Sequence, residues 1–587
     1  MNRPRVTVDT PKVVPSKVEQ QTAAVGQTST PAKTPLTAPE APKAGVAGGI
    51  RLAAELAAQG MSVASARTGL VRALSTELLL PTRVETEELA SSLFADLRVG
   101  KPVDARAAVS RALDAAGPLA VAELCAALAW RLGAAAADGA EAETLERCGS
   151  TLDAIVAAGV QSLATRQPHD SKEALATTIA LSALLSGGQT LDTAYYAPAD
   201  CTYAHHFDAF TNERNLPGAI DALPATGGAM VGVSGGALQT AVATRAEVAV
   251  VADINPEVRD FSIVLGATAM LLDDRARAEG WSDERLGQEL QQRLLGAQRG
   301  NATLVDELRA LGMPEPILAR TPAMAAGLYN ESGMNQRHVW LAPKSFKLDL
   351  GVGTARDDAE VGARVRQIAT LARGGGLVAP VMDLSDPDAP LRLRAFLDAR
   401  GTKVTSVHLS NALDYVLAPK EVVDHLAALP HEPKAVVLSS TAGMNFGLGI
   451  GDWNRPGVNG LDVWLGQGGI RERLRGNTQL FVQNMIKGSF LPYDKHHSVS
   501  VAPGTDPAAV RAQIARIVEE HYADEERAYA SLVVALQGNR RPTPAEKAAL
   551  VQRLRELAVP PPRNPDQVRA LVRALRPLLD AGSSATG

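Results

Sequence analysis

Residues 229–237 read AMVGVSGGA, and this stretch decides the fold prediction. Its apolar start is typical of a buried strand, and the glycine-rich turn 232–236 comes directly before a helical stretch that starts near Ala237. A second apolar run, 248–253, ends in Asp253, seventeen residues after Gly236. This order of elements predicts an α/β unit that holds a nucleoside, because a strand, a glycine turn and a helix are followed by a strand with an acidic end.

Further apolar runs alternate with helical segments over the region 227–505. The strand candidates are 229–233, 248–253, 377–383, 404–410, 435–440, 479–483 and 498–501. Because helical segments such as 359–372 and 390–399 separate most of them, we expect an α/β fold with a doubly wound, mostly parallel seven-stranded sheet. Only about 13 residues join the last two strands, which therefore predict an antiparallel edge hairpin. A mostly helical insertion of more than about 120 residues follows Asp253, with one possible extra strand at 338–341.

The rest of the chain divides by composition. Residues 1–46 contain seven prolines, seven threonines and no aromatic residue, which predicts a disordered leader. Residues 47–190 show helical spacing of Leu and Ala and predict an all-helical domain of four to six helices, with Asp170 and Glu173 as a capping pair before the helix 171–185. We expect a lid-like connection over 191–226, and C-terminal helices with a tail over 506–587.

Composition excludes several classes of function. Lys plus Arg number 59 against 64 Asp plus Glu, for a net charge of -5, so we expect no nucleic acid partner. Cys125, Cys148 and Cys201 are widely spaced and predict neither a disulfide framework nor a zinc site. No apolar run of 18 residues and no signal segment is present, so we expect no membrane partner and a cytoplasmic location by default. Export by a non-Sec system through the leader stays open, and the oligomeric state is not predicted.

The turn 231–237, the acidic strand ends Asp253 and Asp383, and the pair Ser410 and Asn411 resemble motifs of class I S-adenosylmethionine-dependent methyltransferases. The resemblance covers about 275 residues and implies a Rossmann-like fold with S-adenosylmethionine as cofactor. In that family the turn approaches the amino acid part of the cofactor, the second strand holds the ribose, the third contacts adenine and the fourth faces the methyl donor. The positions that the resemblance assigns to cofactor binding are Gly232, Ser234, Gly235, Gly236, Asp253, Asn255, Asp383, Ser410 and Asn411.

Two features depart from the family pattern. Ser234 replaces the middle glycine of the usual G-x-G-x-G turn. The fourth strand also lacks the Asn/Asp-Pro-Pro-aromatic pattern of amino methyltransferases. The resemblance therefore implies methyl transfer to a small-molecule or protein acceptor that it does not identify.

Catalytic candidates lie before the first strand of the sheet. Residues 203–215 contain three aromatic residues, although aromatic residues make up only 4% of the chain. A lid placed there would carry Tyr203, His205 and His206 to the acceptor, with a histidine as the base, and Asn411 would face the donor. A polar connection with surface histidines is an equal alternative. The irregular segment 441–468 adds Asn445, Asp452 and Asn454 as candidate acceptor contacts, and a purely structural loop is an equal alternative. No metal is expected.

A rival interpretation uses the same turn. Residues 232–236 also fit G-x-S-x-G, the nucleophile elbow of serine hydrolases. Asp383 followed by His408, His496 or His497 would complete the chain order of an α/β-hydrolase triad. However, His408 lies in an apolar run that is typical of a core histidine, so we favour the methyltransferase. A non-catalytic interaction or effector protein on the same fold is the third alternative.

Overall fold

The computed structural model describes residues 83–583 except for 138–139, 187–209, 212–215, 235, 255, 330–337, 346–351, 387, 411, 415, 417–418, 440–456, 466–469, 471–473, 475–477, 486–489, 493–494, 503 and 538–542.

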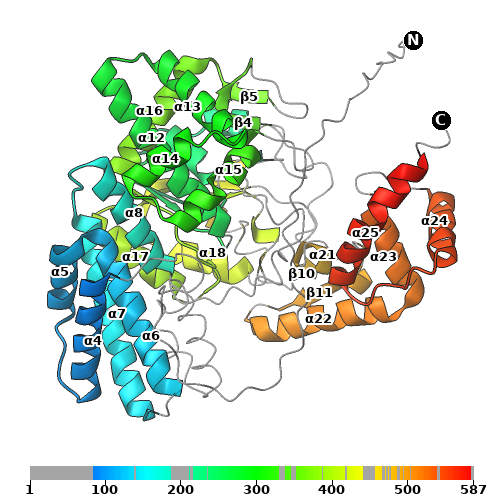
Figure 1. Cartoon of the computed structure of the whole chain (residues 1–587), viewed down its shortest axis with the longest axis horizontal. Coiled ribbons are helices and arrows are strands. Elements are labelled where there is room, and N and C mark those ends of the chain that lie inside the picture. Colours follow the sequence, from blue (N-terminus) through cyan, green and yellow to red (C-terminus); the bar gives the residue numbers. More distant parts are fainter. Residues whose placement is uncertain are drawn as a thin grey trace. The chain divides into compact units, whose positions relative to one another are not determined.

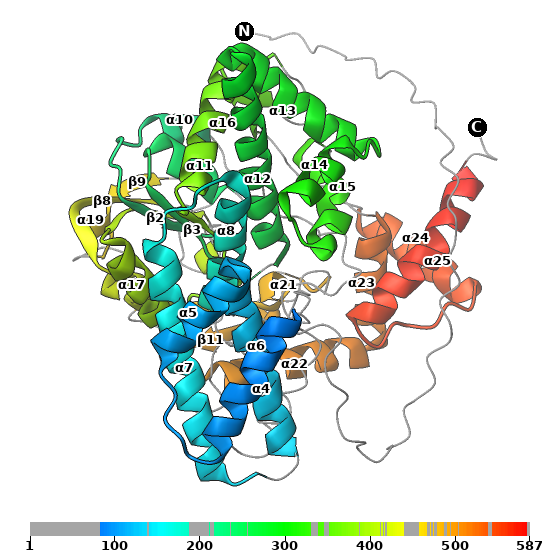
Figure 2. The same cartoon turned by 60° about the vertical axis from the view of Figure 1, so that its left-hand side comes forward.

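The described chain begins with a helical region, as predicted. Its helices are α4 (Val84–Arg98), α5 (Ala105–Ala116), α6 (Pro118–Ala137), α7 (Ala142–Thr165) and α8 (Ser171–Ser186). The predicted capping pair is present at the last of them, since Asp170 Oδ1 accepts a hydrogen bond from Glu173 N at 2.7 Å. Figures 1 and 2 show α4 to α7 as one bundle, and α8 contacts both this bundle and strand β6 of the main sheet.

The main sheet has six strands in the order β6-β3-β2-β7-β8-β9. The strands are β2 (Ala229–Gly232), β3 (Val248–Val251), β6 (Leu377–Val378), β7 (Val404–Ser410), β8 (His431–Ser439) and β9 (Gly457–Gly460). All neighbours pair in parallel except β8 and β9. The prediction of a mostly parallel sheet is therefore confirmed. The helices that join or flank these strands are α10 (Leu216–Asp221), α11 (Ala237–Ala243), α17 (Ala389–Arg400), η1 (Ala412–Asp414), α18 (Pro419–Ala428) and α19 (Leu461–Leu465).

Seven strands and an edge hairpin in one sheet were expected, and the hairpin strands lie elsewhere. The last two predicted strands, β10 (Thr478–Phe481) and β11 (Ser498–Val501), pair antiparallel as a separate two-stranded sheet. The antiparallel edge of the main sheet is β9, inside the segment predicted to be irregular. Its sequence Gly457-Val458-Asn459-Gly460 has low strand propensity, so only its pairing with β8 makes it a strand.

The insertion between β3 and β6 forms a helical unit with its own small sheet. It contains α12 (Pro256–Glu279), α13 (Asp283–Gln298), α14 (Thr303–Leu311), α15 (Glu315–Tyr329), β4 (His338–Pro343), β5 (Val352–Ala355) and α16 (Asp358–Arg373). The expected extra strand is β4, which pairs with β5 and, antiparallel, with β1 (Phe210–Thr211). The fully buried Asp273 carboxylate forms ion pairs with Arg366 and Arg373 at 2.8 and 3.0 Å. These ion pairs connect α12 to α16.

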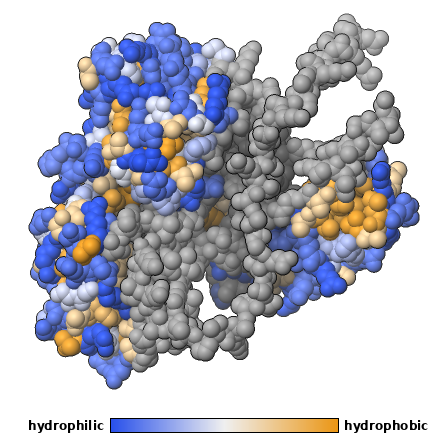
Figure 3. Space-filling view, in the orientation of Figure 1, coloured by the Kyte–Doolittle hydropathy of each residue, from blue (hydrophilic) through white to orange (hydrophobic). Residues whose placement is uncertain are grey.

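The C-terminal region, β10 to α25, has a separate apolar core. Its helices are α21 (Val482–Met485), η3 (Lys495–His497), α22 (Pro507–Ala523), α23 (Glu525–Gln537), α24 (Pro544–Glu556) and α25 (Pro565–Ser583). Figure 3 shows hydrophobic side chains gathered on the surface of these C-terminal helices, where Leu571 and Val572 of α25 are only partly buried.

Candidate functional site

The carboxyl ends of the parallel strands bring the predicted cofactor residues to one edge of the sheet. β2 lies between β3 and β7, and the chain passes from β2 to β3 and β6 before it returns to β7 on the other side of β2. Ligands of open α/β sheets bind where the strand order reverses in this way. The turn 232–236 follows β2 at this point, Asp253 follows β3, and Ser410 ends β7.

Gly232 is required by close packing at the start of the turn. A Cβ at this position would lie 2.8 Å from His408 Cβ and 2.9 Å from both Ala237 Cβ and the His408 carbonyl oxygen. Strand β7 and the first residue of α11 therefore leave no room for a side chain. At Gly236 the same test gives 3.4 Å to Ser234 Oγ and 3.6 Å to His408 Nε2, which is ordinary contact.

Ser234 adopts the left-handed conformation that favours glycine, with a φ of 68°. Its N–H donates to Asp253 Oδ2 at 2.8 Å, and its Oγ accepts from Gly236 N at 3.2 Å. The Val233 N–H donates to the His408 carbonyl oxygen at 2.9 Å. The described N–H groups of the turn are thus bonded within the protein, and the Asp253 carboxylate lies directly against the turn.

Asp383 follows β6, the neighbour of β3 in the sheet, so its segment runs beside the one that contains Asp253. Asp253 forms a parallel bridge with Val381, its carbonyl oxygen accepts from Met382 N at 2.8 Å, and its N–H donates to Pro380 O at 3.3 Å. Asp383 Oδ1 accepts from both the N–H and the hydroxyl of Ser385, at 2.8 and 2.6 Å. The described segments after β2, β3 and β6, namely 233–236 without 235, 252–254 and 379–386, contain three Asp residues and neither Lys nor Arg.

His408 is a buried core residue of β7. Its side chain is 2% exposed, and Nδ1 lies 2.7 Å from the hydroxyl oxygen of Thr240 in α11. Burial lowers the pKa of His408 to about 4, so the ring is neutral at pH 7. Its partner is a hydroxyl and no carboxylate, which differs from the histidine of a Ser-His-Asp triad.

Several predicted site residues lie outside the described residues. They are Tyr203, His205, His206, Gly235, Asn255, Asn411, Asn445, Asp452 and Asn454. At the end of the predicted lid, Phe210 and Thr211 pair with β4 of the insertion. The segment is therefore anchored at this point to the insertion sheet, a connection that the sequence does not predict.

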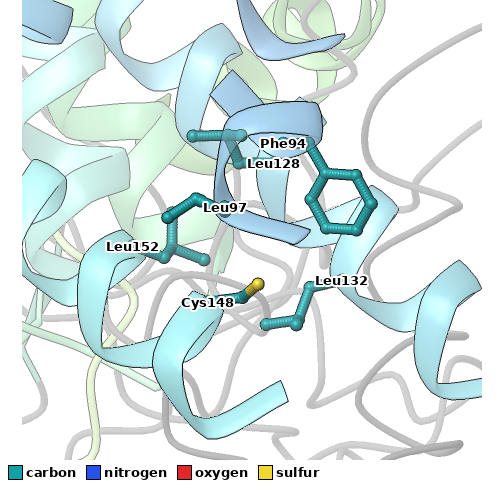
Figure 4. Close-up of a pocket in the computed structure, with 6 residues that line it drawn as sticks. All are labelled: Phe94, Leu97, Leu128, Leu132, Cys148 and Leu152. Carbon is teal, nitrogen blue, oxygen red and sulfur yellow. The ribbon is translucent and has the colours of Figure 1, made fainter. Parts of the chain in front are cut away.

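The described residues also form a small apolar pocket, which lies far in sequence from the residues at the sheet edge. Figure 4 shows it within the helical bundle, lined by Phe94, Leu97, Leu128, Leu132, Cys148 and Leu152. Burial raises the pKa of the Cys148 thiol, which keeps it protonated and unreactive. The pocket has no charged group to orient a ligand, so the edge of the sheet remains the candidate site.

In the described chain, no helix combines the length and hydrophobicity needed to cross a membrane, and no group of three His, Cys, Asp or Glu residues is placed to hold a metal ion. The sequence reasoning missed Thr240, which supports His408, and two serines of α8 that bond the edge of β6. The four-residue spacing of Thr178, Ser182 and Ser186 along the buried part of α8 was the available signal. No protein family model matches the chain, and no curated protein matches it.

Proposed function

We propose that the protein binds S-adenosylmethionine at the carboxyl edge of β2, β3 and β6 and transfers its methyl group to a small-molecule or protein acceptor. The observation that carries this proposal is the 2.8 Å hydrogen bond from Ser234 N to Asp253 Oδ2. It puts a carboxylate at the glycine turn, where it would accept hydrogen bonds from the hydroxyls of a ribose.

The strand order supports a nucleoside at this position. The parallel strands β6-β3-β2-β7-β8 follow the 3-2-1-4-5 part of the doubly wound nucleotide-binding order. The main sheet also ends in an antiparallel strand, β9, although this strand is not part of the hairpin that the sequence predicted.

The charge and hydrogen bonding of the edge favour a cationic nucleoside over a phosphate. Three aspartates and no basic residue occupy the described segments after β2, β3 and β6. A pyrophosphate needs free N–H groups in the turn, whereas Ser234 N and Gly236 N donate to Asp253 and Ser234. A dinucleotide would have to displace these two bonds, whereas S-adenosylmethionine has no phosphate and would not.

The chain's own residues would act by binding and orientation. Asp253 would hold the ribose, Asp383 the adenine, and Gly232 would allow the close approach of the turn. When bound, S-adenosylmethionine supplies a methyl group that is already activated, so alignment with the acceptor is the main requirement. Removal of an acceptor proton is assigned to His205 or His206, since the buried His408 is bonded beneath the turn.

The serine hydrolase is the second candidate, and the left-handed Ser234 after a strand is the feature that favours it. Three contacts oppose it. Ser234 Oγ accepts from Gly236 N, His408 bonds Thr240, and Asp383 bonds Ser385. The Asp253 carboxylate beside Ser234 would also repel the oxyanion of an acyl-transfer intermediate.

Calorimetric titration with S-adenosylhomocysteine tests the proposal. Asp253→Asn keeps an oxygen for Ser234 N–H but removes the charge, and it should weaken binding by about tenfold or more because hydrogen bonds to charged groups contribute about 1.5–3 kcal/mol. Asp398→Ala, an exposed aspartate of α17, is the matched control and should bind like the wild type. Absence of binding heat in the wild type would reject the methyltransferase.

A fluorophosphonate probe separates the alternatives. Under the proposal Ser234 is not labelled, because its hydroxyl accepts from Gly236 N and, within the described residues, forms no hydrogen bond with a histidine. Labelling of the wild type that Ser234→Ala abolishes would establish the hydrolase. If neither binding nor labelling occurs, the interaction or effector protein is the remaining interpretation.

A further inference from the structure

Helix α8 covers the outer edge of β6 through two serine hydroxyls. Ser182 Oγ accepts from Ala379 N at 2.9 Å, and Ser186 Oγ accepts from Val381 N at 2.8 Å. The same hydroxyls donate to the carbonyl oxygens of Thr178 and Ser182, each at 2.6 Å. Both serines are at most 2% exposed, so these bonds replace the water that an open sheet edge would bind.

The spacing of the two serines matches the strand. Four residues of an α-helix rise about 6 Å, and two residues of a strand rise about 6.6 Å. Ser182 and Ser186 therefore face alternate N–H groups on one side of the strand, those of Ala379 and Val381. On the other side of the same strand, Pro380 O and Met382 N bond the backbone of Asp253.

The segment that leads to Asp383 is thus held from both sides. Asp253 fixes its inner side, and Ser186 fixes its outer side two residues before Asp383. Arg392 of α17 adds a third connection, since it donates to Leu185 O at the end of α8 and to Asp386 Oδ2 after Asp383, both at 3.1 Å. The two-residue strand β6 has few ladder bonds of its own to set this position.

We propose that Ser182 and Ser186 are positioning residues for the cofactor site, through which the helical region holds Asp383 at the adenine position. This inference rests on the proposed function. The serines do not contact the cofactor themselves, and they act by fixing the strand end. The helical region then holds a part of the binding site in position, which a mobile lid would not do.

A double-mutant cycle tests this role with S-adenosylhomocysteine as the ligand. Ser186→Ala should weaken binding about fivefold, because the unbonded Val381 N–H lets the strand end shift. Ser182→Ala, which acts two residues further from Asp383, should weaken it less. Ser262→Ala is the matched control, since the buried Ser262 also bonds the carbonyl oxygen four residues before it, Val258 O at 2.8 Å, and it should bind like the wild type.

The Asp383→Asn background shows whether the effect passes through Asp383. There, Ser186→Ala should cause little further loss if it acts by positioning that carboxylate. The positioning role would be overturned if the wild type binds and Ser186→Ala binds equally well. It would also be overturned if Ser186→Ala loses the same affinity in the wild-type and Asp383→Asn backgrounds. In both cases the proposed function stands. No binding by the wild type would reject both proposals.

Amide hydrogen exchange separates a folding defect from a positioning defect. Without ligand, the Ala379 and Val381 amides should exchange slowly in the wild type and faster in the serine variants, while the rest of the sheet is unchanged. If Ser186→Ala proves unfolded by circular dichroism, the same cycle with Ser182→Ala decides the question. Unchanged exchange at these two amides would contradict the inference.

Discussion

The α/β region and the C-terminal region both bury a histidine, but they bond it to different partners. In the α/β region, His408 bonds the Thr240 hydroxyl, which can donate or accept by rotation. In the C-terminal region, His521 lies between two partners, with Nδ1 2.8 Å from His497 Nε2 and Nε2 2.9 Å from Ser531 Oγ. A hydroxyl adapts to either tautomer of a histidine by rotation, whereas a second neutral ring must change its own tautomer to do so.

The proton positions in the C-terminal cluster follow from its hydrogen bonds. Ser531 has one hydroxyl proton and donates it to the Phe490 carbonyl oxygen at 3.1 Å. We therefore assign the other two protons so that His521 Nε2 donates to Ser531 Oγ and His497 Nε2 donates to His521 Nδ1. A proton added to His521 Nδ1 would place two N–H groups against each other. Burial lowers the pKa of both histidines to about 4, so both regions should lose stability in acid, and the contact between two rings distinguishes the C-terminal region.

The largest effect should come from the backbone packing of the α/β region, which does not depend on pH. Helices α13 and α16 cross at Gly287 and Gly362, where a Cβ on Gly362 would lie 1.9 Å from Asp283 O. Gly362→Ala must separate the helices, and it should lower the free energy of unfolding by on the order of 4 kcal/mol. Urea denaturation at pH 7.5 and at pH 5 should give the same loss.

Gly296→Ala is the control within α13. A Cβ there meets only Asn301 at 3.6 Å or more, so alanine should be neutral or stabilise by about 0.5–1 kcal/mol through its helix propensity. Equal effects of the two substitutions would contradict the close crossing of α13 and α16.

Acid should destabilise the C-terminal region next most strongly. Burial, with help from His497 and Arg527, lowers the pKa of His521 to about 4 from an ordinary value of 6.5. Because the folded-state pKa is depressed, its stabilisation is complete above pH 6.5 and is lost as the pH falls through 4. A shift of this size corresponds to about 3 kcal/mol. Hydrogen exchange of residues 507–537, corrected for intrinsic rates, should show loss of protection over this range.

The groups around the cluster define the control. The charge of Arg527 lowers the pKa of His521, whereas a hydrogen bond with the Arg527 backbone and the charge of Asp524 raise it. Arg569 of α25 lowers the pKa of the neighbouring Tyr522. His521→Gln retains a donor and an acceptor but does not titrate, so its acid-dependent loss of protection should shrink. Protection that stays constant from pH 7 to pH 4 in the wild type would refute the assigned proton positions.

The sequence predicted the strands better than their arrangement. Apolar runs such as 229–231 and 248–252 identify β2 and β3, because buried parallel strands need apolar side chains on both faces. It failed at β9, whose glycine-rich sequence becomes a strand only against β8, and at the hairpin β10-β11, which pairs apart from the main sheet. Pairing between distant strands depends on tertiary packing that local patterns do not contain.

The candidate site also contains residues that local sequence identifies and residues that only tertiary contacts identify. Gly232 and Asp253 are recognisable because a turn and a strand end constrain residue type locally. Ser182 and Ser186 act on residues almost 200 positions away, at separations of 197 and 195. The sequence shows only that a helix contains serines at these positions. Their role follows from the strand segment that they bond, which local sequence does not reveal.

Thr240→Val should give the smallest effect and the sharpest test of the hydroxyl partner. It keeps the shape of the side chain but leaves His408 Nδ1 without its bond, which should lower the free energy of unfolding by about 1–2 kcal/mol at pH 7.5. Thr321→Val is the control, because the buried Thr321 bonds only the helix carbonyl of Ile317, at 3.0 Å, and its loss should cost about 0.5 kcal/mol or less.

The comparison of these two threonines decides what the hydroxyl does. If Thr240→Val proves as mild as Thr321→Val in urea denaturation, His408 is held by packing alone and the hydroxyl is incidental. If it costs more, the Thr240 bond orients the ring that lies against Gly236. The loss should then be accompanied by faster exchange of the Val233 amide, since Val233 N donates to the carbonyl oxygen of the same histidine. A hydroxyl under the turn would in that case help to set the shape of the turn that faces the ligand.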